Sequence, residues 1–244
     1  MRKIPILMFH NISSPPRGKR LTSLYTHPAS FHRQMSTLSH LGYKGLSLQE
    51  LQPYLRGEKS EKVFGITFDD GYLDNYCNAL PVLKKFAFSA TCYLVSGFIG
   101  KQNDWTRNQN VQECDLMDTI HVRKWLQEGM AIGSHSHTHA HLCQIPAERL
   151  ENEIFHSKIL LENTFQIPIE DFCFPYGEFS PQTLALLKKA NYKTGVTTQR
   201  GRASQTDDIF ALPRVHMTKR TNLALLLMKV LTPYEDHRRR VSGL

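Results

Sequence analysis

Short runs of apolar residues alternate along the chain with longer segments in which apolar residues recur every three or four positions. The short runs predict β-strands, and the longer segments predict amphipathic helices. Strands are expected at residues 4–9, 63–68, 89–96, 130–133, 171–174, 192–198 and 210–217. Helices are expected at residues 30–41, 46–55, 73–86, 118–128, 147–165, 180–191 and 222–231. Such alternation builds parallel sheets, so the pattern predicts one α/β domain over residues 1–244, with a barrel as a candidate arrangement. A basic tail is expected from about residue 234.

The composition agrees with this class of protein. The chain has 244 residues, of which 41% are hydrophobic and 21% charged, which is enough for one large domain with a sizeable core. No apolar stretch approaches the roughly 20 residues that a membrane-spanning helix requires. The N-terminal apolar run contains Pro5 and has no small-residue cleavage site after it, so we interpret it as a strand and expect a cytoplasmic protein. An extracytoplasmic or membrane-peripheral location is the alternative.

The cysteines indicate neither a disulfide framework nor a thiolate zinc site, because they are odd in number, widely scattered and form no CxxC pair. They are Cys77, Cys92, Cys114, Cys143 and Cys173. We therefore expect reduced thiols, most of them buried.

The net charge of +8 is partly concentrated at residues 17–20 and 237–240. Basic clusters of this kind suit an anionic polymer, a phosphorylated lipid carrier or peripheral contact with an anionic membrane surface. Solvated tails are the alternative interpretation. No nucleic-acid-binding module accompanies the clusters, so we expect no nucleic-acid partner.

Two adjacent carboxylates, Asp69 and Asp70, follow the predicted strand at residues 63–68. Ionised groups at the end of a buried strand are costly unless a metal, another cation or helix N-terminal amides compensate them. Gly71 permits a tight turn beside them. A simple Asp-Asp-Gly turn leading into a helix is the alternative interpretation of this segment.

Histidines occupy alternate positions further along the chain. They are His135, His137, His139 and His141. In a helical turn, residues four apart share a face, and such a pair suits zinc and similar metals; a solvated His-rich loop is the alternative. Together with Asp70, one pair supplies three ligands and leaves an open position, as in catalytic zinc sites. A metal in such a site lowers the pKa of a bound water to ~7, and Asp69 is placed to take its proton.

Three short segments match the motifs of a known family. They are TFDDGY at residues 67–72, HSHTH at residues 135–139 and FPYG at residues 174–177. They resemble the first motif, the second motif (H-[ST]-x-[ST]-H) and the end of the third motif (R-x-P-Y-G) of polysaccharide deacetylases with a NodB-like domain, carbohydrate esterase family 4. The similarity runs in order from about residue 4 to 230. The ending FxFPYG is most similar to the exopolysaccharide and poly-N-acetylglucosamine deacetylase branch.

The resemblance implies a deformed (β/α) barrel that removes N-acetyl groups from an acetylated amino-sugar polymer or glycan. It implies Asp69 as the general base. It also implies a divalent metal, most often Zn²⁺ with Co²⁺ or Ni²⁺ as alternatives, held by Asp70, His135 and His139. The backbone N–H of Tyr176, in the turn with Pro175, is the implied second donor to the reaction's oxyanion.

Four further residues are candidates for the same site. His216 lies in a segment similar to the family's last motif, whose histidine protonates the leaving amine; a core histidine is the alternative. His10, at the end of the first predicted strand, is a candidate for supporting the site or binding substrate. Tyr72 and Trp105 are candidates for stacking on sugar rings. For these last three residues, a purely structural role is the alternative.

The chain departs from the family pattern at Cys173, which occupies the position of the third-motif Arg that orients the base. Arg214 is the candidate replacement, and we group it with the substrate-binding residues.

The function indicated is a metal-dependent glycan N-deacetylase. An O-deacetylase or an amidase acting on a small acylated sugar would use the same ligands. A non-catalytic glycan-binding module is the alternative from another class, because the usual Arg is missing.

Overall fold

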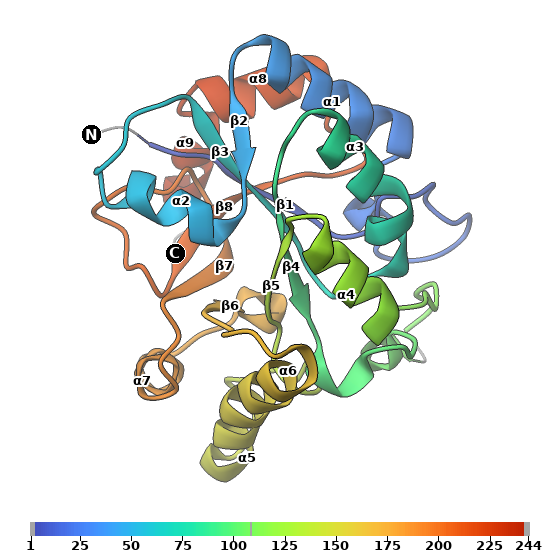
Figure 1. Cartoon of the computed structure of the whole chain (residues 1–244), viewed down its shortest axis with the longest axis vertical. Coiled ribbons are helices and arrows are strands. Elements are labelled where there is room, and N and C mark those ends of the chain that lie inside the picture. The colour runs from blue at the N-terminus through green and yellow to red at the C-terminus, as the bar shows by residue number, and fades with distance from the viewer. Residues whose placement is uncertain (1–2, 108, 242–244) are drawn as a thin grey trace.

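The computed structural model describes residues 3–107 and 109–241. Its strands are β1 (Ile6–Phe9), β2 (Lys44–Leu46), β3 (Val63–Phe68), β4 (Thr91–Leu94), β5 (Ala131–Ser134), β6 (Asp171–Cys173), β7 (Thr194–Arg200) and β8 (Leu212–His216). Its α-helices are α1 (Pro28–His40), α2 (Leu48–Leu55), α3 (Leu80–Lys85), α4 (Thr119–Gln127), α5 (Ala147–Glu151), α6 (Ser157–Phe165), α7 (Pro181–Lys189), α8 (Leu223–Leu231) and α9 (Tyr234–Val241). The helices surround the strands (Figure 1). No helix within the described ranges is long and apolar enough to cross a membrane.

The strands of the described residues form one parallel sheet in the order β1-β8-β7-β6-β5-β4-β3-β2. β1 also pairs with β3, from Ile6 beside Gly65 to Phe9 beside Phe68, which closes a ring of seven strands and leaves β2 outside it. This arrangement confirms the predicted deformed (β/α) barrel. Because the strands are parallel, their carboxyl ends meet at one rim, where (β/α) barrels carry their active sites.

Local sequence signals explain several element boundaries. Ser47 accepts a hydrogen bond from the Glu50 backbone while the Glu50 side chain returns to the Ser47 amide, so α2 begins with the expected capping box. Ser180 caps α7 in the same way, with Pro181 in its first turn. The helix expected from residue 46 begins at Leu48 because β2 takes the residues before the cap.

Two predicted helices are interrupted by a π-helical turn. Residues 73–86 contain the turn Asn75–Ala79 before α3, and residues 147–165 contain the turn Asn152–His156 between α5 and α6. Pro81 lies in the first turn of α3 and has no N–H to donate. The missing donor accounts for the change in the backbone hydrogen-bonding pattern there. Amphipathic periodicity does not distinguish a π turn from regular helix.

The expectation of a basic tail from about residue 234 is wrong. α9 begins at Tyr234, and Glu235 and Asp236 are buried with exposed fractions of 0% and 9%. Arg200 and Lys229 pair with Glu235, and Arg202 and Lys3 pair with Asp236. This ion-pair network, which we call the α9 network, holds the helix against the barrel. Residues 242–244 of the expected tail lie outside the described residues.

All five cysteines are free thiols, as expected. Only two of them are buried, Cys92 and Cys173, so the expectation that most are buried is wrong.

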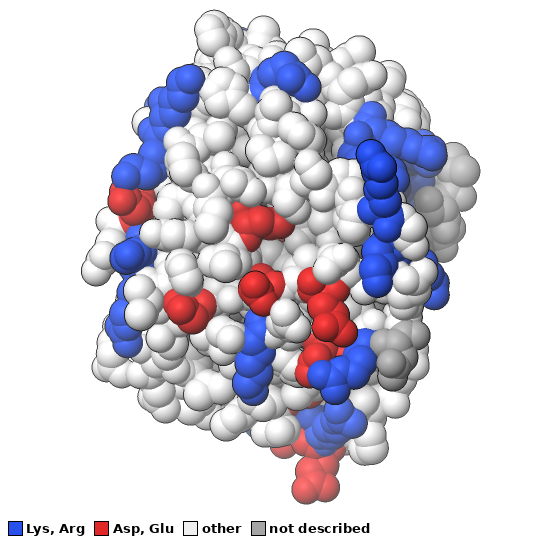
Figure 2. All heavy atoms as spheres, turned by 90° about the vertical axis from the view of Figure 1, so that its right-hand side faces the viewer, with Lys and Arg blue, Asp and Glu red and all other residues white. Residues whose placement is uncertain are grey.

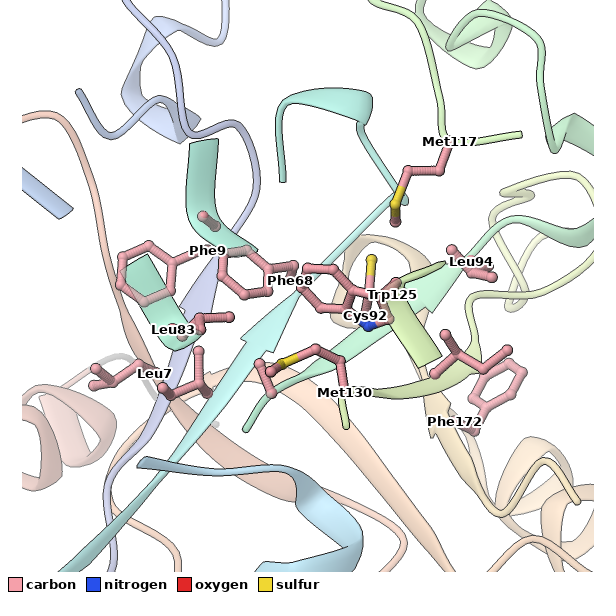
Figure 3. Packing of buried hydrophobic residues seen from close by; sticks show 14 of the residues in the cluster. Leu7, Phe9, Phe68, Leu83, Cys92, Leu94, Met117, Trp125, Met130 and Phe172 are labelled. Atoms are coloured by element: carbon pink, nitrogen blue, oxygen red, sulfur yellow. The ribbon is translucent and has the colours of Figure 1, made fainter. Parts of the chain in front are cut away.

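A hydrophobic core between the barrel and its helices supports the ends of β1 and β3. The Phe9 ring stacks on Phe68 at a centroid distance of 5.6 Å, and Phe68 meets Trp125 edge-on at 5.9 Å. Figure 3 shows these rings side by side in the core. Because side chains alternate along a strand, residues that follow an outward-facing Phe point into the barrel. This packing therefore directs His10 and Asp69 toward the barrel interior.

Candidate active site

The carboxyl rim of the barrel gathers the predicted site residues around one cavity of about 450 Å³. Its lining includes His10 after β1, Asp69 and Asp70 after β3, His135 and His139 after β5, Tyr176 after β6 and His216 at the end of β8. Tyr72 and Trp105 also line the cavity. Pro175 and Arg214 are buried and do not contribute to the lining.

Asp70, His135 and His139 form a group suited to a metal ion. The Nε2 atoms of His135 and His139 lie 3.3 and 3.2 Å from Asp70 Oδ1. His135 Nδ1 hydrogen-bonds to the Cys173 carbonyl at 2.7 Å, which turns Nε2 of the ring toward Asp70. A carbonyl behind the ring is the usual arrangement for a ligating histidine.

An unsatisfied polar atom supports this fit. Asp70 Oδ1 is buried and has no hydrogen-bond partner in the described structure. Although burial opposes ionisation, His135 and His139 hold the pKa of Asp70 well below its usual range. Two imidazoles and one carboxylate are donors that a zinc-like divalent ion accepts. The residues present therefore fit the metal that the resemblance implies.

Asp69 is held by Arg214, which reaches it through the interior of the barrel. Arg214 Nη1 and Nη2 donate to the two carboxylate oxygens of Asp69, each at 2.7 Å. Arg214 has an exposed fraction of 0%, and its Nε donates to the Thr197 carbonyl. Burial raises the pKa of Asp69, but the Arg214 charge outweighs it and lowers the pKa below its usual value.

This ion pair agrees with the hypothesis that Arg214 replaces the missing third-motif Arg. Cys173 lies beside the pair, with its Sγ 3.3 Å from Arg214 Nη2. A buried arginine has no surface to offer a substrate, so grouping Arg214 with the substrate-binding residues is wrong. His10 Nε2 is 3.8 Å from Asp69 Oδ2, on the cavity side.

Backbone strain is concentrated at this rim. Asp70, Ser136, His139 and Tyr176 have φ angles of 75°, 64°, 59° and 58°, in the left-handed region that is unfavourable for residues with a side chain. Each such residue costs of the order of 1–3 kcal/mol, and such strain clusters at functional sites. Asp70 and His139 are two of the three residues of the metal-binding group.

Aromatic rings cover the metal-binding group. Trp105 stacks on His139 with a centroid distance of 4.7 Å and an interplanar angle of 19°. Tyr176 meets His139 edge-on at 4.7 Å and stacks on His141 at 3.8 Å. Trp105 thus packs on a candidate ligand, a position that its place in a long polar loop did not predict.

The remaining histidines make other contacts. His137 Nδ1 lies 2.9 Å from Ser96 Oγ, and His141 Nδ1 lies 3.1 Å from a Glu178 carboxylate oxygen. Neither belongs to a metal-binding group in the described part of the chain. The pair spaced by four residues that converges on Asp70 is therefore His135 and His139.

His216 is neutral in this structure. Its Nε2–H donates to the Thr198 carbonyl at 2.6 Å, and burial, aided by the Arg200 and Arg214 charges, lowers its pKa to about 4. Tyr72 is only 5% exposed, and burial raises its pKa well above its usual value. Pro175 is buried inside the turn that presents Tyr176.

The fold is a closed parallel (β/α) barrel, and its carboxyl rim carries two adjacent aspartates and two histidines. These features are typical of a hydrolase built on a (β/α) barrel. The chain belongs to the polysaccharide deacetylase family, whose model matches residues 56–195. The deacetylases of carbohydrate esterase family 4 are hydrolases that depend on a metal.

Individual relatives agree with this assignment. The chain is 34% identical over 218 residues to Bacillus subtilis YxkH, whose name assigns it to the polysaccharide deacetylases; the match covers 88% of this chain and 72% of that protein. It is 22% identical over 208 residues to the Staphylococcus aureus poly-β-1,6-N-acetyl-D-glucosamine N-deacetylase, covering 81% and 69%. The structure of the Streptococcus pyogenes deacetylase PplD in complex with acetate superposes with a TM-score of 0.82 at 27% identity, covering 94% of this chain and 98% of that chain.

Proposed function

We propose that this chain removes N-acetyl groups from an N-acetylated amino-sugar polymer, with a Zn²⁺ ion held by Asp70, His135 and His139. The observation that carries the proposal is that the two adjacent aspartates have different partners. Arg214 compensates the charge of Asp69 within the protein, whereas Asp70 faces two histidines and has an unsatisfied oxygen. When bound, a divalent metal polarises the amide carbonyl and acidifies water.

The side chains of the protein move the protons in this reaction. Each Asp69 oxygen retains a lone pair beyond its bond to Arg214, so Asp69 accepts the proton of the attacking water. The same carboxyl group then gives that proton to the departing amine nitrogen, because His216, with a pKa of about 4, carries no spare proton at neutral pH. The Tyr176 amide, in the turn that follows β6 and borders the cavity, is the protein donor to the oxyanion.

The charge distribution around the cavity agrees with an uncharged sugar amide. No Lys or Arg among the described residues lines the cavity. On the face of the molecule that carries the loops after β1 and β4, Lys and Arg lie mainly along the two sides, and Asp and Glu lie nearer the middle (Figure 2). The titratable and aromatic side chains that line the reacting centre are those of Asp, His, Tyr, Trp and Phe residues.

Acetate release from N-acetylglucosamine oligomers tests the proposal. The metal-free protein should release no acetate, and one equivalent of Zn²⁺ should restore release from β-1,6-linked or β-1,4-linked oligomers. O-acetylated oligomers of the same length, offered in parallel, test the O-deacetylase alternative. A protein that holds stoichiometric Zn²⁺ and releases acetate only from the O-acetylated oligomers, or from neither substrate, would contradict the proposal.

A further inference from the structure

The loop that carries His135 and His139 is not stable by its own geometry. Ser136 and His139 both have left-handed φ angles, and the only bond that closes the loop on itself in the described structure runs from the His139 amide to Ser136 Oγ. On one side, the Ser96 and Gly97 amides donate to the carbonyls of Ser136 and His137. On the other side, the loop's own amides need acceptors.

Glu153 supplies those acceptors. Its Oε2 accepts the backbone N–H groups of His137 and Thr138 at 2.9 and 2.8 Å, and its Oε1 accepts the Thr138 hydroxyl at 2.5 Å. Its exposed fraction is 1%. A carboxylate with this burial is costly unless it is hydrogen-bonded, and here the metal-binding loop provides all three bonds.

The π-helical turn Asn152–His156 places Glu153 under the loop. In this turn Glu153 and Ile154 are both buried, although an acidic residue within an amphipathic helix is normally expected on the solvent face. π turns are rare and are frequent at functional sites. The π-helical segment between α5 and α6 thus provides the hydrogen-bond acceptors for the loop between His135 and His139.

We infer that Glu153 is a positioning residue for the metal ligands of this site. The effect of Glu153 on metal binding stands apart from the proposed function; its effect on deacetylation rests on that function. By fixing the amides of His137 and Thr138, it holds the strained loop so that the His135 and His139 rings converge on Asp70. Groups that orient metal ligands typically change metal affinity 10–100-fold when removed. Glu153 does not touch the metal group itself.

Zn²⁺ affinity of the whole chain tests this inference without any substrate. Competition with a chromophoric chelator gives the dissociation constant, and the fluorescence of Trp105, which stacks on His139, gives a second readout with Co²⁺ as a quencher. Glu153→Ala should weaken Zn²⁺ binding at least tenfold. Glu153→Gln keeps one carbonyl acceptor for the two amides and should stay within about threefold of the parent protein. Glu151→Ala is the matched control and should change nothing. Glu151 is on the same helical segment and exposed, and its one ion pair among the described residues is with Lys189.

Thr138 provides a second test if Glu153→Ala does not fold. Thr138→Val removes one of the three bonds and should weaken Zn²⁺ binding several-fold, whereas Thr138→Ser keeps the hydroxyl and should restore it. Parent-like Zn²⁺ affinity in folded Glu153→Ala, or in Thr138→Val when the alanine variant does not fold, would overturn the inference. Since no acetate is measured, this outcome is distinguishable from failure of the proposed function.

Discussion

The chain buries two pairs of adjacent acidic residues, Asp69–Asp70 at the carboxyl rim of the barrel and Glu235–Asp236 at the start of α9, and compensates them differently. In the α9 network each carboxylate meets two fixed cations: Arg200 and Lys229 at Glu235, Arg202 and Lys3 at Asp236. At the rim, Asp69 has Arg214. Asp70 meets only histidines in the described structure.

This difference distinguishes a stabilising pair from the pair that we propose to be functional. The charges of Glu235 and Asp236 are fully compensated by cations of the protein. These two residues hold α9 in place and need no external cation. Asp70 retains an unsatisfied oxygen in a strained backbone position, which the protein tolerates where an external cation completes the site. In this chain, the pair that contains a carboxylate without a fixed cation is therefore the pair that we propose to be functional.

The largest expected effect comes from Asp69→Asn. An amide cannot accept the water proton, so turnover should fall about 10³-fold. Because Asp70, His135 and His139 are untouched, Zn²⁺ affinity should remain within a few-fold of the parent protein. Acetate release and chelator competition on the same preparation measure both quantities. Turnover within tenfold of the parent would refute the base assignment.

Glu235→Gln should lower the free energy of unfolding by about 3–5 kcal/mol, because it leaves Arg200 and Lys229 with an uncompensated buried charge. Urea denaturation of the metal-free protein measures this loss. Glu151→Gln, in an exposed pair with Lys189, is the control that should leave stability unchanged. A parent-like midpoint for Glu235→Gln would show that the α9 network is not stabilising.

Asp171 tests what happens to a buried carboxylate with neither a fixed cation nor a metal group. It accepts a hydrogen bond from Thr194, its Oδ2 has no partner in the described structure, and burial raises its pKa from 3.8 to about 7. A raised folded-state pKa contributes stability below the unfolded value, and this stability is lost as pH rises through about 7.

Asp171→Asn should remove that dependence on pH. The stability difference in favour of the variant should grow between pH 4 and 7, to roughly 4 kcal/mol at full effect. Urea titrations of both proteins at pH 4, 6 and 8 measure it. A difference that stays constant across this range would mean that Asp171 has an ordinary pKa.

Asp70→Asn should abolish the stabilisation that Zn²⁺ gives to the folded protein. For the parent protein this increment is about 2.7 kcal/mol at a free Zn²⁺ concentration 100-fold above the dissociation constant. Thermal unfolding with and without Zn²⁺ measures it. The Glu235→Gln protein is less stable but should gain the same stabilisation from Zn²⁺ as the parent protein. If it gained less, the α9 network would be energetically coupled to the metal-binding group.

Much of the barrel could be predicted from the sequence, because its strands are short apolar runs and its helices carry local caps. β2 was missed because three residues with one central Gly provide too little periodicity. The two π turns were missed because a single inserted residue hardly changes an amphipathic pattern. α9 was missed because its sequence is mostly charged, and only its ion partners in β7 and at residues 202, 229 and 3 make burial favourable.

The sequence predicted the residues of the metal-binding group and the carboxylate beside them, because they lie in short contiguous motifs that resemble those of the family and follow predicted strands. Only the tertiary structure decided what holds each of them. Arg214 lies 145 positions from Asp69 along the chain, and Glu153 reaches the metal-binding loop from an irregular helix turn. Such partners leave no local periodicity, since barrel closure and helix packing, not sequence neighbours, bring the groups together.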